Sequence, residues 1–226
     1  MLVSTSTAPD FHPVVKDLPR VAMAPGATLE LLVLAADRDH CAGVDLASGA
    51  LVRAWSPEPS AHRLRAYDVV AVTLDELGVN FDGVPDPSEP EALRLAGPPK
   101  PLRRANRRHV IRLLRPLLHP TGQPLLGMSS TVVPFWERRR DHPSIALVEP
   151  EGPITLWRDG PYLACRFGWA GHERELPCLD RRVAAGMDRA GRSHMIAGRD
   201  DRLLVALTPP IQGRCHKVVE AILPRP

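Results

Sequence analysis

Short hydrophobic runs separated by turn-forming residues dominate the chain. Residues 29–38 (LELLVLAADR) form a continuous apolar run rich in branched side chains, which is typical of a buried strand. Residues 40–55 then predict a strand–turn–strand hairpin, and residues 67–77 predict another strand. From residue 142 onward, four more short runs follow one another, punctuated by Gly, Pro and Asp-Gly. The pattern predicts a mainly β fold.

One segment has the periodicity of a helix. Residues 102–119 place apolar side chains on one helical stripe and arginines on another, and Pro116 should end or kink that helix about one turn before its apparent end. Residues 180–201 form a less regular stretch that is broken by Gly and Asp-Arg. The last apolar run, near residues 214–223, could be a helix, but the alternation around Lys217 favours a strand.

The order of strands, basic helix and strands excludes a doubly wound sheet, because strands and helices do not alternate. It predicts two small β-barrels or sandwiches. The boundaries that we expect are an extended N-terminal lead-in over 1–26, a first barrel over 27–98, a Pro-rich, basic helical connector over 99–141 and a second barrel over 142–226.

Composition and charge exclude few classes of partner or cellular location. The 226 residues carry a net charge of +3, which by itself implies no polyanionic partner. The basic residues are 26 Arg and three Lys, and Arg makes planar bidentate contacts that Lys cannot make. A GC-rich bacterial genome produces the same bias. We see no secretory signal, and the apolar stretch at 29–36 is too short to span a bilayer. We therefore expect a cytoplasmic protein without a membrane partner and with four reduced cysteines.

Motifs for chemistry are sparse. The chain has no Gly-rich phosphate loop, and its cysteines do not occur in the close pairs typical of structural zinc sites. We interpret them as small buried hydrophobic residues. No catalytic residue, metal site or cofactor is predicted, and a Cys/His-dependent enzyme is kept as a remote alternative.

The hairpin can be divided into two faces. Ala42 and Val44 point to one side, where we expect Val52 and Ala54 to join them in the core, with Gly49 in the turn at positive φ.

Arg53 and Trp55 should then lie on the outer face, together with Cys41. A cation beside an aromatic ring is the chemistry of single-stranded nucleic-acid binding, where bases stack and phosphates pair. The alternative is that Trp55 folds over the barrel end and packs there.

Other basic residues extend this surface. The candidate nucleic-acid contacts are Arg53, Trp55, Arg63, Arg65, Arg103, Arg104, Arg107, Arg108, Arg112, Arg115, Tyr162 and Arg166. In the helical segment the alternative is a solvated face neutralised by the acidic residues at 82–91. Glu173 and Glu175 should dilute the positive potential near Tyr162 and Arg166.

The chain resembles a known family in the stretches CAGVDLASGALVRAW, YDVVAVTLDEL, HPSIALVEPEG, YLACRFGWAGHERELPCLD and LLVALTPPIQGRCHKVVEAIL, which occur in order over most of residues 29–223. They look like the bacterial dual OB-fold domain. Leu51 and His216 stand where an aromatic residue would be usual. The residues that match, and that we interpret as fold-defining, are Cys41, Gly43, Asp45, Gly49, Arg53, Gly171, Leu176 and Pro177.

The resemblance implies two OB-like barrels, a nucleic-acid-binding role and a place in bacterial defence or conflict gene neighbourhoods. OB barrels bind oligonucleotides mainly on the face of strands 2 and 3. The leading hypothesis is a non-catalytic module that binds nucleic acid, single-stranded and with little sequence preference. The alternative is a protein–protein adaptor whose arginines meet acidic partners, since fold alone does not imply function.

Overall fold

The computed structural model describes residues 24–58, 64–75, 89–138 and 142–226. The fold is mainly β, with 48% strand and 14% helix, and its curled sheets include a half-barrel. The mainly β prediction is therefore confirmed. The described part of the chain contains no helix that is both long enough and apolar enough to cross a membrane.

Six strands form the first sheet, in the order β5-β3-β2-β1-β4-β6. They are β1 (Thr28–Ala36), β2 (His40–Asp45), β3 (Leu51–Trp55), β4 (Asp68–Thr73), β5 (Ala92–Arg94) and β6 (Lys100–Arg104). The strands predicted at 29–38, 40–55 and 67–77 correspond to β1 to β4. The sheet also curls, because the amide of Asp75 donates to the carbonyl of Arg94 at 3.0 Å, which joins the ends of β4 and β5.

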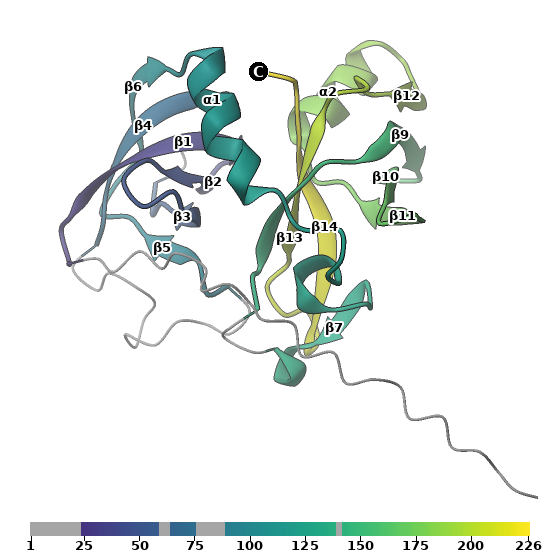
Figure 1. Ribbon diagram of the computed structural model, residues 1–226, viewed down its shortest axis with the longest axis horizontal. Helices are drawn as coiled ribbons and strands as arrows, with labels where there is room; N and C mark the ends of the chain where they lie inside the picture. Colours follow the sequence, from purple (N-terminus) through teal and green to yellow (C-terminus); the bar gives the residue numbers. More distant parts are fainter. Residues whose placement is uncertain (1–23, 59–63, 76–88, 139–141) are drawn as a thin grey trace, which may run out of the picture.

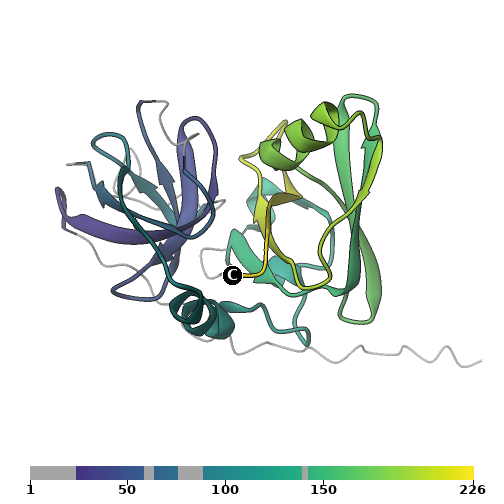
Figure 2. The same ribbon diagram turned by 90° about the horizontal axis from the view of Figure 1, so that it is seen from above.

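Two four-stranded sheets make up the rest of the β structure. The second sheet has the order β11-β10-β9-β12, and the third has the order β7-β14-β13-β8. Their strands are β7 (Val132–Pro134), β8 (Ile145–Val148), β9 (Glu151–Asp159), β10 (Tyr162–Trp169), β11 (His172–Pro177), β12 (His194–Ile196), β13 (Arg202–Leu207) and β14 (Arg214–Leu223). The final apolar run is thus a strand, as the alternation indicated. Figures 1 and 2 show the first sheet on one side of the molecule and the second on the other, with β13 and β14 between them.

The predicted helix at 102–119 is too long at both ends. Its first residues belong to β6, which pairs with β4, and the helix α1 covers only Arg107–Leu114. Asn106 caps α1, its side chain accepting from the amide of His109 at 2.9 Å. A short 3-10 helix (Arg115–Leu117) follows and contains Pro116, so the helix ends where the proline predicted.

The segment 180–201 is more regular than its sequence indicated. It contains the helix α2 (Arg181–Arg189) and the strand β12. One carboxylate oxygen of Asp180 accepts from the amides of Arg182 and Val183, and the other accepts from the amide of Ile222 at 3.0 Å. This side chain therefore both caps α2 and ties it to β14.

The register of the β2–β3 hairpin differs from the predicted one. Cys41 pairs with Ala54, and Ala42 pairs with Arg53. Paired residues of an antiparallel sheet point to the same face. Arg53 therefore shares a face with Ala42, while Val52 and Ala54 pack with Cys41 in a separate cluster. The predicted division of the hairpin into a core face and an outer face is wrong.

The turn explains this register. The amide of Asp45 donates to the carbonyl of Ala50 at 2.9 Å, so even-numbered residues face odd-numbered ones across the hairpin. The Asp45 carboxylate accepts from the amide of Ser48 at 2.9 Å, and Gly49 has a φ of 75°. The positive φ predicted at Gly49 is confirmed, and the interaction of Asp45 with the turn gives that residue a structural role.

Both faces of the hairpin are buried because the chain forms three apolar clusters. One cluster lies within the first sheet and includes Leu31 and Val52. A second joins the first sheet and α1 to the third sheet, through residues such as Val44 and Leu204. A third lies between the second and third sheets and includes Phe167. The third sheet is covered on both faces, so the two halves of the chain pack directly against each other.

Gly43 lies where β2 passes too close to β1 for a side chain. A Cβ atom at this position would lie 2.5 Å from the carbonyl oxygen of Leu32. We expect Gly43→Ala to lower the free energy of unfolding by about 2–3 kcal/mol, measured by urea denaturation. The control is Gly186→Ala in α2, where a Cβ would meet nothing within 4 Å and should add about 0.5–1 kcal/mol. Equal stability of Gly43→Ala and the wild type would contradict the close approach.

Candidate functional site

The helix α1 presents arginines to solvent because its apolar stripe is anchored in the protein. Val110 and Leu114 are buried in the cluster between the first and third sheets. Four exposed arginines follow the rest of this segment, and we call them the α1 arginine surface: Arg107, Arg108, Arg112 and Arg115. The helix contains no acidic residue. The predicted separation of apolar and basic stripes is confirmed within Arg107–Leu114, and Arg115 follows directly.

The arginines of β6 are neutralised, whereas those of α1 have no acidic partner among the described residues. Arg103 pairs with Glu30 at 2.6 Å, and its hydrogen bond lowers the pKa of that carboxyl group. Arg104 pairs with Asp68 at 3.0 Å. Among the residues that the structure describes, no acidic side chain forms an ion pair with any member of the α1 arginine surface.

The acidic segment 82–91 was the expected neutralising partner of the helix. Residues 82–88 lie outside the described residues. Glu89 instead contacts Arg53, and Glu91 accepts hydrogen bonds from the amide and hydroxyl groups of Ser144. The two acidic side chains of this segment that can be placed are therefore used elsewhere.

Arg53 and Trp55 do not form an outward platform. The Arg53 side chain is only 6% exposed, and its Nη1 donates to Glu89 at 2.9 Å and to the carbonyl of Leu207 at 3.1 Å. The indole Nε1–H of Trp55 donates to the other oxygen of Glu89 at 3.2 Å. The face that was expected to be exposed is instead the contact between the first sheet and β13, so the predicted accessibility of Arg53 is wrong.

Glu220 completes this buried cluster from β14. The pairing between β13 and β14 passes from Ala221 to Val219, so Glu220 is the extra residue of a β-bulge. Its carboxylate lies 3.3 Å from Nε2 of His40 and 3.9 Å from Nη2 of Arg53. Burial alone would raise the pKa of Glu220, but the close contact with His40 and the positive charge of Arg53 lower it. Burial likewise opposes the charging of His40, whose pKa is nevertheless raised by Glu220.

A cleft of about 160 Å³ opens beside this cluster. His40 and Trp55 line one side, with their rings 4.6 Å apart, and Arg181 and Arg182 line another at the start of α2. Arg181 is paired with Asp37 at 3.0 Å. The charges around this cleft are largely compensated by one another, which indicates a structural junction between the two halves.

The remaining predicted contacts are scattered. Arg63 lies outside the described residues, and Arg65 is exposed. Tyr162 is 71% exposed on β10. Arg166 lies over the ring of Trp157, 4.9 Å from its centroid. It pairs with Glu175 at 3.1 Å and Glu173 at 3.5 Å, so the predicted dilution of positive charge on this face is confirmed.

The four cysteines are buried. Burial raises the pKa of Cys41 and of Cys178 to about 12 and raises that of Cys165 as well. A protonated thiol is a poor nucleophile. The interpretation of the cysteines as buried apolar residues is confirmed, and the Cys/His-dependent enzyme finds no support at these positions. In the described part of the chain, no group of three or more His, Cys, Asp or Glu is arranged to hold a metal ion.

The sequence reasoning missed a second cleft, of about 290 Å³, on the second half of the chain. Lys217 of β14 and Trp169 of β10 line it, and both are almost fully buried. The available signal was the pair of charged residues, Lys217 and Glu220, inside the apolar run of β14. A charged residue that is buried on a strand requires a partner, so such residues point to polar sites.

Comparisons with protein-family models, with curated proteins and with solved structures find no match for this chain.

Proposed function

We propose that the chain is a non-catalytic nucleic-acid-binding module that contacts phosphate through the α1 arginine surface. The observation that carries this proposal is the exposure of four arginines without an acidic partner among the described residues. An arginine guanidinium forms bidentate contacts with phosphate oxygens, and such contacts are independent of sequence. We therefore assign little sequence preference to the binding.

The fold is compatible with this role. The first sheet curls until the ends of β4 and β5 share backbone hydrogen bonds, including one from the amide of Ala96 to the carbonyl of Thr73 at 2.9 Å. Gly43, one of the residues in the resemblance, sits at a close approach between β1 and β2. These features support the proposed OB-like nature of the first half, and OB folds commonly bind single strands. Tyr162 is an exposed aromatic residue that we assign to base stacking.

The test is the binding of a labelled single-stranded oligonucleotide across a salt series. The variant replaces Arg107, Arg108, Arg112 and Arg115 with glutamine. We expect the affinity to fall roughly tenfold or more, and the slope of log K against log salt to decrease by about 3, since each lost phosphate contact removes about 0.7.

A matched control removes the same charge elsewhere. Arg38, Arg189, Arg192 and Arg199 are also exposed, so their joint replacement with glutamine changes the net charge equally. This control should keep most of the salt slope. Equal losses in both variants would show only nonspecific attraction, and no binding by the wild type at about 50 mM salt would overturn the proposal.

One observation favours the alternative of a protein–protein adaptor. Leu102 of β6 is 48% exposed and Ile111 of α1 is 39% exposed, and both lie among the arginines. Arginine mixed with exposed apolar side chains is common at protein interfaces. If the oligonucleotide does not bind, capture of a partner on this face becomes the experiment, with Leu102→Ser and Ile111→Ser as the variants that should abolish it.

A further inference from the structure

The second cleft is lined by hydrogen-bond donors and by no described acidic residue. It lies between the segment 121–131, the facing ends of β10 and β11, and β14. Its cationic and neutral donors include Lys217, Arg174, Trp169, His172, Gln123 and Ser129. In contrast to the cleft beside Arg53, none of the described lining residues is Asp or Glu. The charge of this cleft is therefore uncompensated from within.

Lys217 is the central cation of the cleft. The residue is only 3% exposed, and its ammonium group donates to the carbonyl of Met128. Burial, together with the positive charges of Arg174 and Arg138, lowers the pKa of Lys217 to about 8. An ammonium group has three donors, and a single carbonyl does not neutralise its charge. An anion in the cleft would satisfy both requirements.

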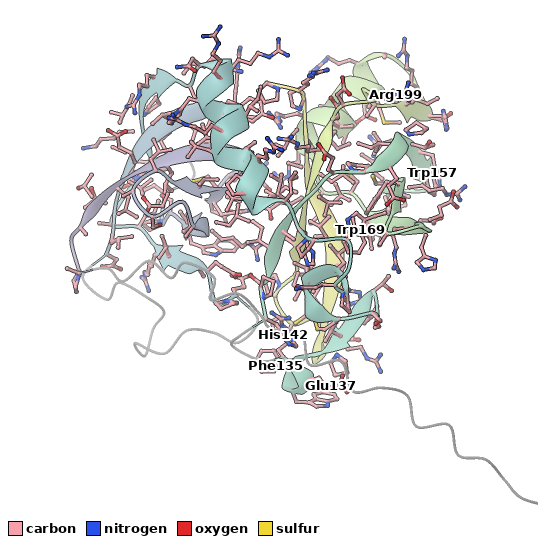
Figure 3. All side chains as sticks on the ribbon, in the orientation of Figure 1. Phe135, Glu137, His142, Trp157, Trp169 and Arg199 are labelled. Carbon is pink, nitrogen blue, oxygen red and sulfur yellow. The ribbon has the colours of Figure 1, made fainter. Side chains whose placement is uncertain are left out.

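Two further donors are buried without an acceptor. The Nε1–H of Trp169 and the Nε–H of Arg174 have no hydrogen-bond partner among the described residues. Trp169 is 1% exposed and lies beside β14 (Figure 3). The ring of His119 contacts it edge-on, with the ring centroids 5.5 Å apart. Both nitrogens are closed to solvent, so these unpartnered donors make the wall of the cleft more positive rather than contacting a ligand directly.

We propose that this cleft is a binding site for a phosphate-class oxyanion, held by Lys217 and Arg174, with the buried indole N–H of Trp169 adding positive potential to its wall. A tetrahedral oxyanion offers several acceptor oxygens and a charge of −1 to −2, which matches a cleft of donors with two cations. The cleft could take a free phosphorylated small molecule or the phosphorylated end of a nucleic-acid strand. The site is separate from the α1 arginine surface and does not depend on the role proposed for it.

The first experiment titrates the full chain with sodium sulfate against sodium chloride of equal ionic strength, following binding by calorimetry and stability by thermal unfolding. We expect saturable sulfate binding that Lys217→Met and Arg174→Gln weaken tenfold or more. Arg166→Gln is the matched control, because Arg166 is exposed on β10 and pairs with Glu175 outside the cleft. Sulfate stays doubly charged above pH 6, so its affinity should be constant up to about pH 8 and then fall as Lys217 loses its proton.

The second experiment identifies the source of the phosphate. Inorganic phosphate is compared with an oligonucleotide that carries a 5′-phosphate and with its unphosphorylated twin. Tighter binding of the phosphorylated twin, lost in Lys217→Met, assigns the site to a strand end. Equal binding of the two oligonucleotides, together with binding of inorganic phosphate, assigns the site to a small molecule.

The proposal is overturned if sulfate and phosphate stabilise the wild type no more than chloride does, or if Lys217→Met and Arg174→Gln bind them as the wild type does. If oligonucleotide binding is lost only when the α1 arginine surface is replaced with glutamine, the result tests the proposed nucleic-acid role of that surface and leaves this cleft unaffected.

Discussion

Replacing Arg53 with alanine is expected to lower the free energy of unfolding by about 3–5 kcal/mol, because it removes the cation from a buried charge cluster. Glu89 lies 2.9 Å from this guanidinium, and Glu220 lies 3.9 Å from it, and both carboxylates are at most 10% exposed. The carbonyl of Leu207 would also lose its donor. The cluster joins the first sheet to β13 and β14, so its loss should loosen the packing of the two halves. Urea denaturation at pH 7 measures the effect.

A triple variant tests whether the loss of stability comes from the unpaired charges, and an exposed arginine serves as the control. Arg53→Met combined with Glu89→Gln and Glu220→Gln removes all three charges, and we expect it to recover most of the lost stability, because no unpaired carboxylate remains buried. Arg65→Ala removes an exposed arginine of the same half and should change stability by less than about 0.5 kcal/mol. If Arg53→Ala were as stable as the wild type and yet lost oligonucleotide binding, the hairpin would again be the contact surface.

The sequence pattern predicted the positions of the strands better than it predicted which strands pair with one another. Apolar runs such as residues 29–38 identify a buried strand from its composition alone. By contrast, all five residues of β6 are exposed, and backbone pairing with β4 defines it, so its sequence carries no apolar signal. The arginines of β6 continue those of α1, which is why a single helix was predicted there. The missed helix α2 did have a signal, since Asp180 is a favourable N-cap residue.

The candidate site was less accessible to sequence reasoning because it depends on register and on packing between the halves. One residue of hairpin register decides which face Arg53 occupies, and the pairing of Asp45 with Ala50 fixes that register only in three dimensions. Whether the exposed face of a strand meets solvent or another sheet is equally invisible in the local pattern. The arginines of α1 were predictable, because a helical period alone separates them from Val110 and Leu114.

Replacing Lys217 with methionine is expected to stabilise the protein at pH 7 by about 2 kcal/mol in a buffer without phosphate or sulfate. The pKa of this lysine falls from 10.5 to about 8 in the folded chain, a shift worth about 3 kcal/mol against the charged form. Losing the hydrogen bond to the carbonyl of Met128 should return about 1 kcal/mol of this gain. Methionine has a similar length and fills the same space without a charge.

The pH dependence follows from the direction of this shift. Between pH 8 and pH 10.5 the unfolded chain binds the lysine proton while the folded chain has released it. Stability due to Lys217 therefore rises with pH through this window, since the unfolded state binds more protons. Below pH 8 both states are protonated, and the full penalty of burying the charge is present. The advantage of Lys217→Met should thus be constant below about pH 8, shrink above it and vanish before pH 10.5, because the lost hydrogen bond to Met128 outweighs the penalty that remains there.

Urea denaturation of both proteins at intervals between pH 6 and pH 10.5 measures this difference. Lys100→Met is the matched control, because Lys100 is exposed on β6 and its replacement should give a small difference that does not vary with pH. A wild type that is more stable than Lys217→Met at pH 7, with a difference that is flat across the window, would mean that the ammonium group is well paired within the protein. In that case Lys217 would contribute to the stability of the free protein. If the charge of Lys217 instead destabilises the free protein, its presence is explained by a ligand that it binds.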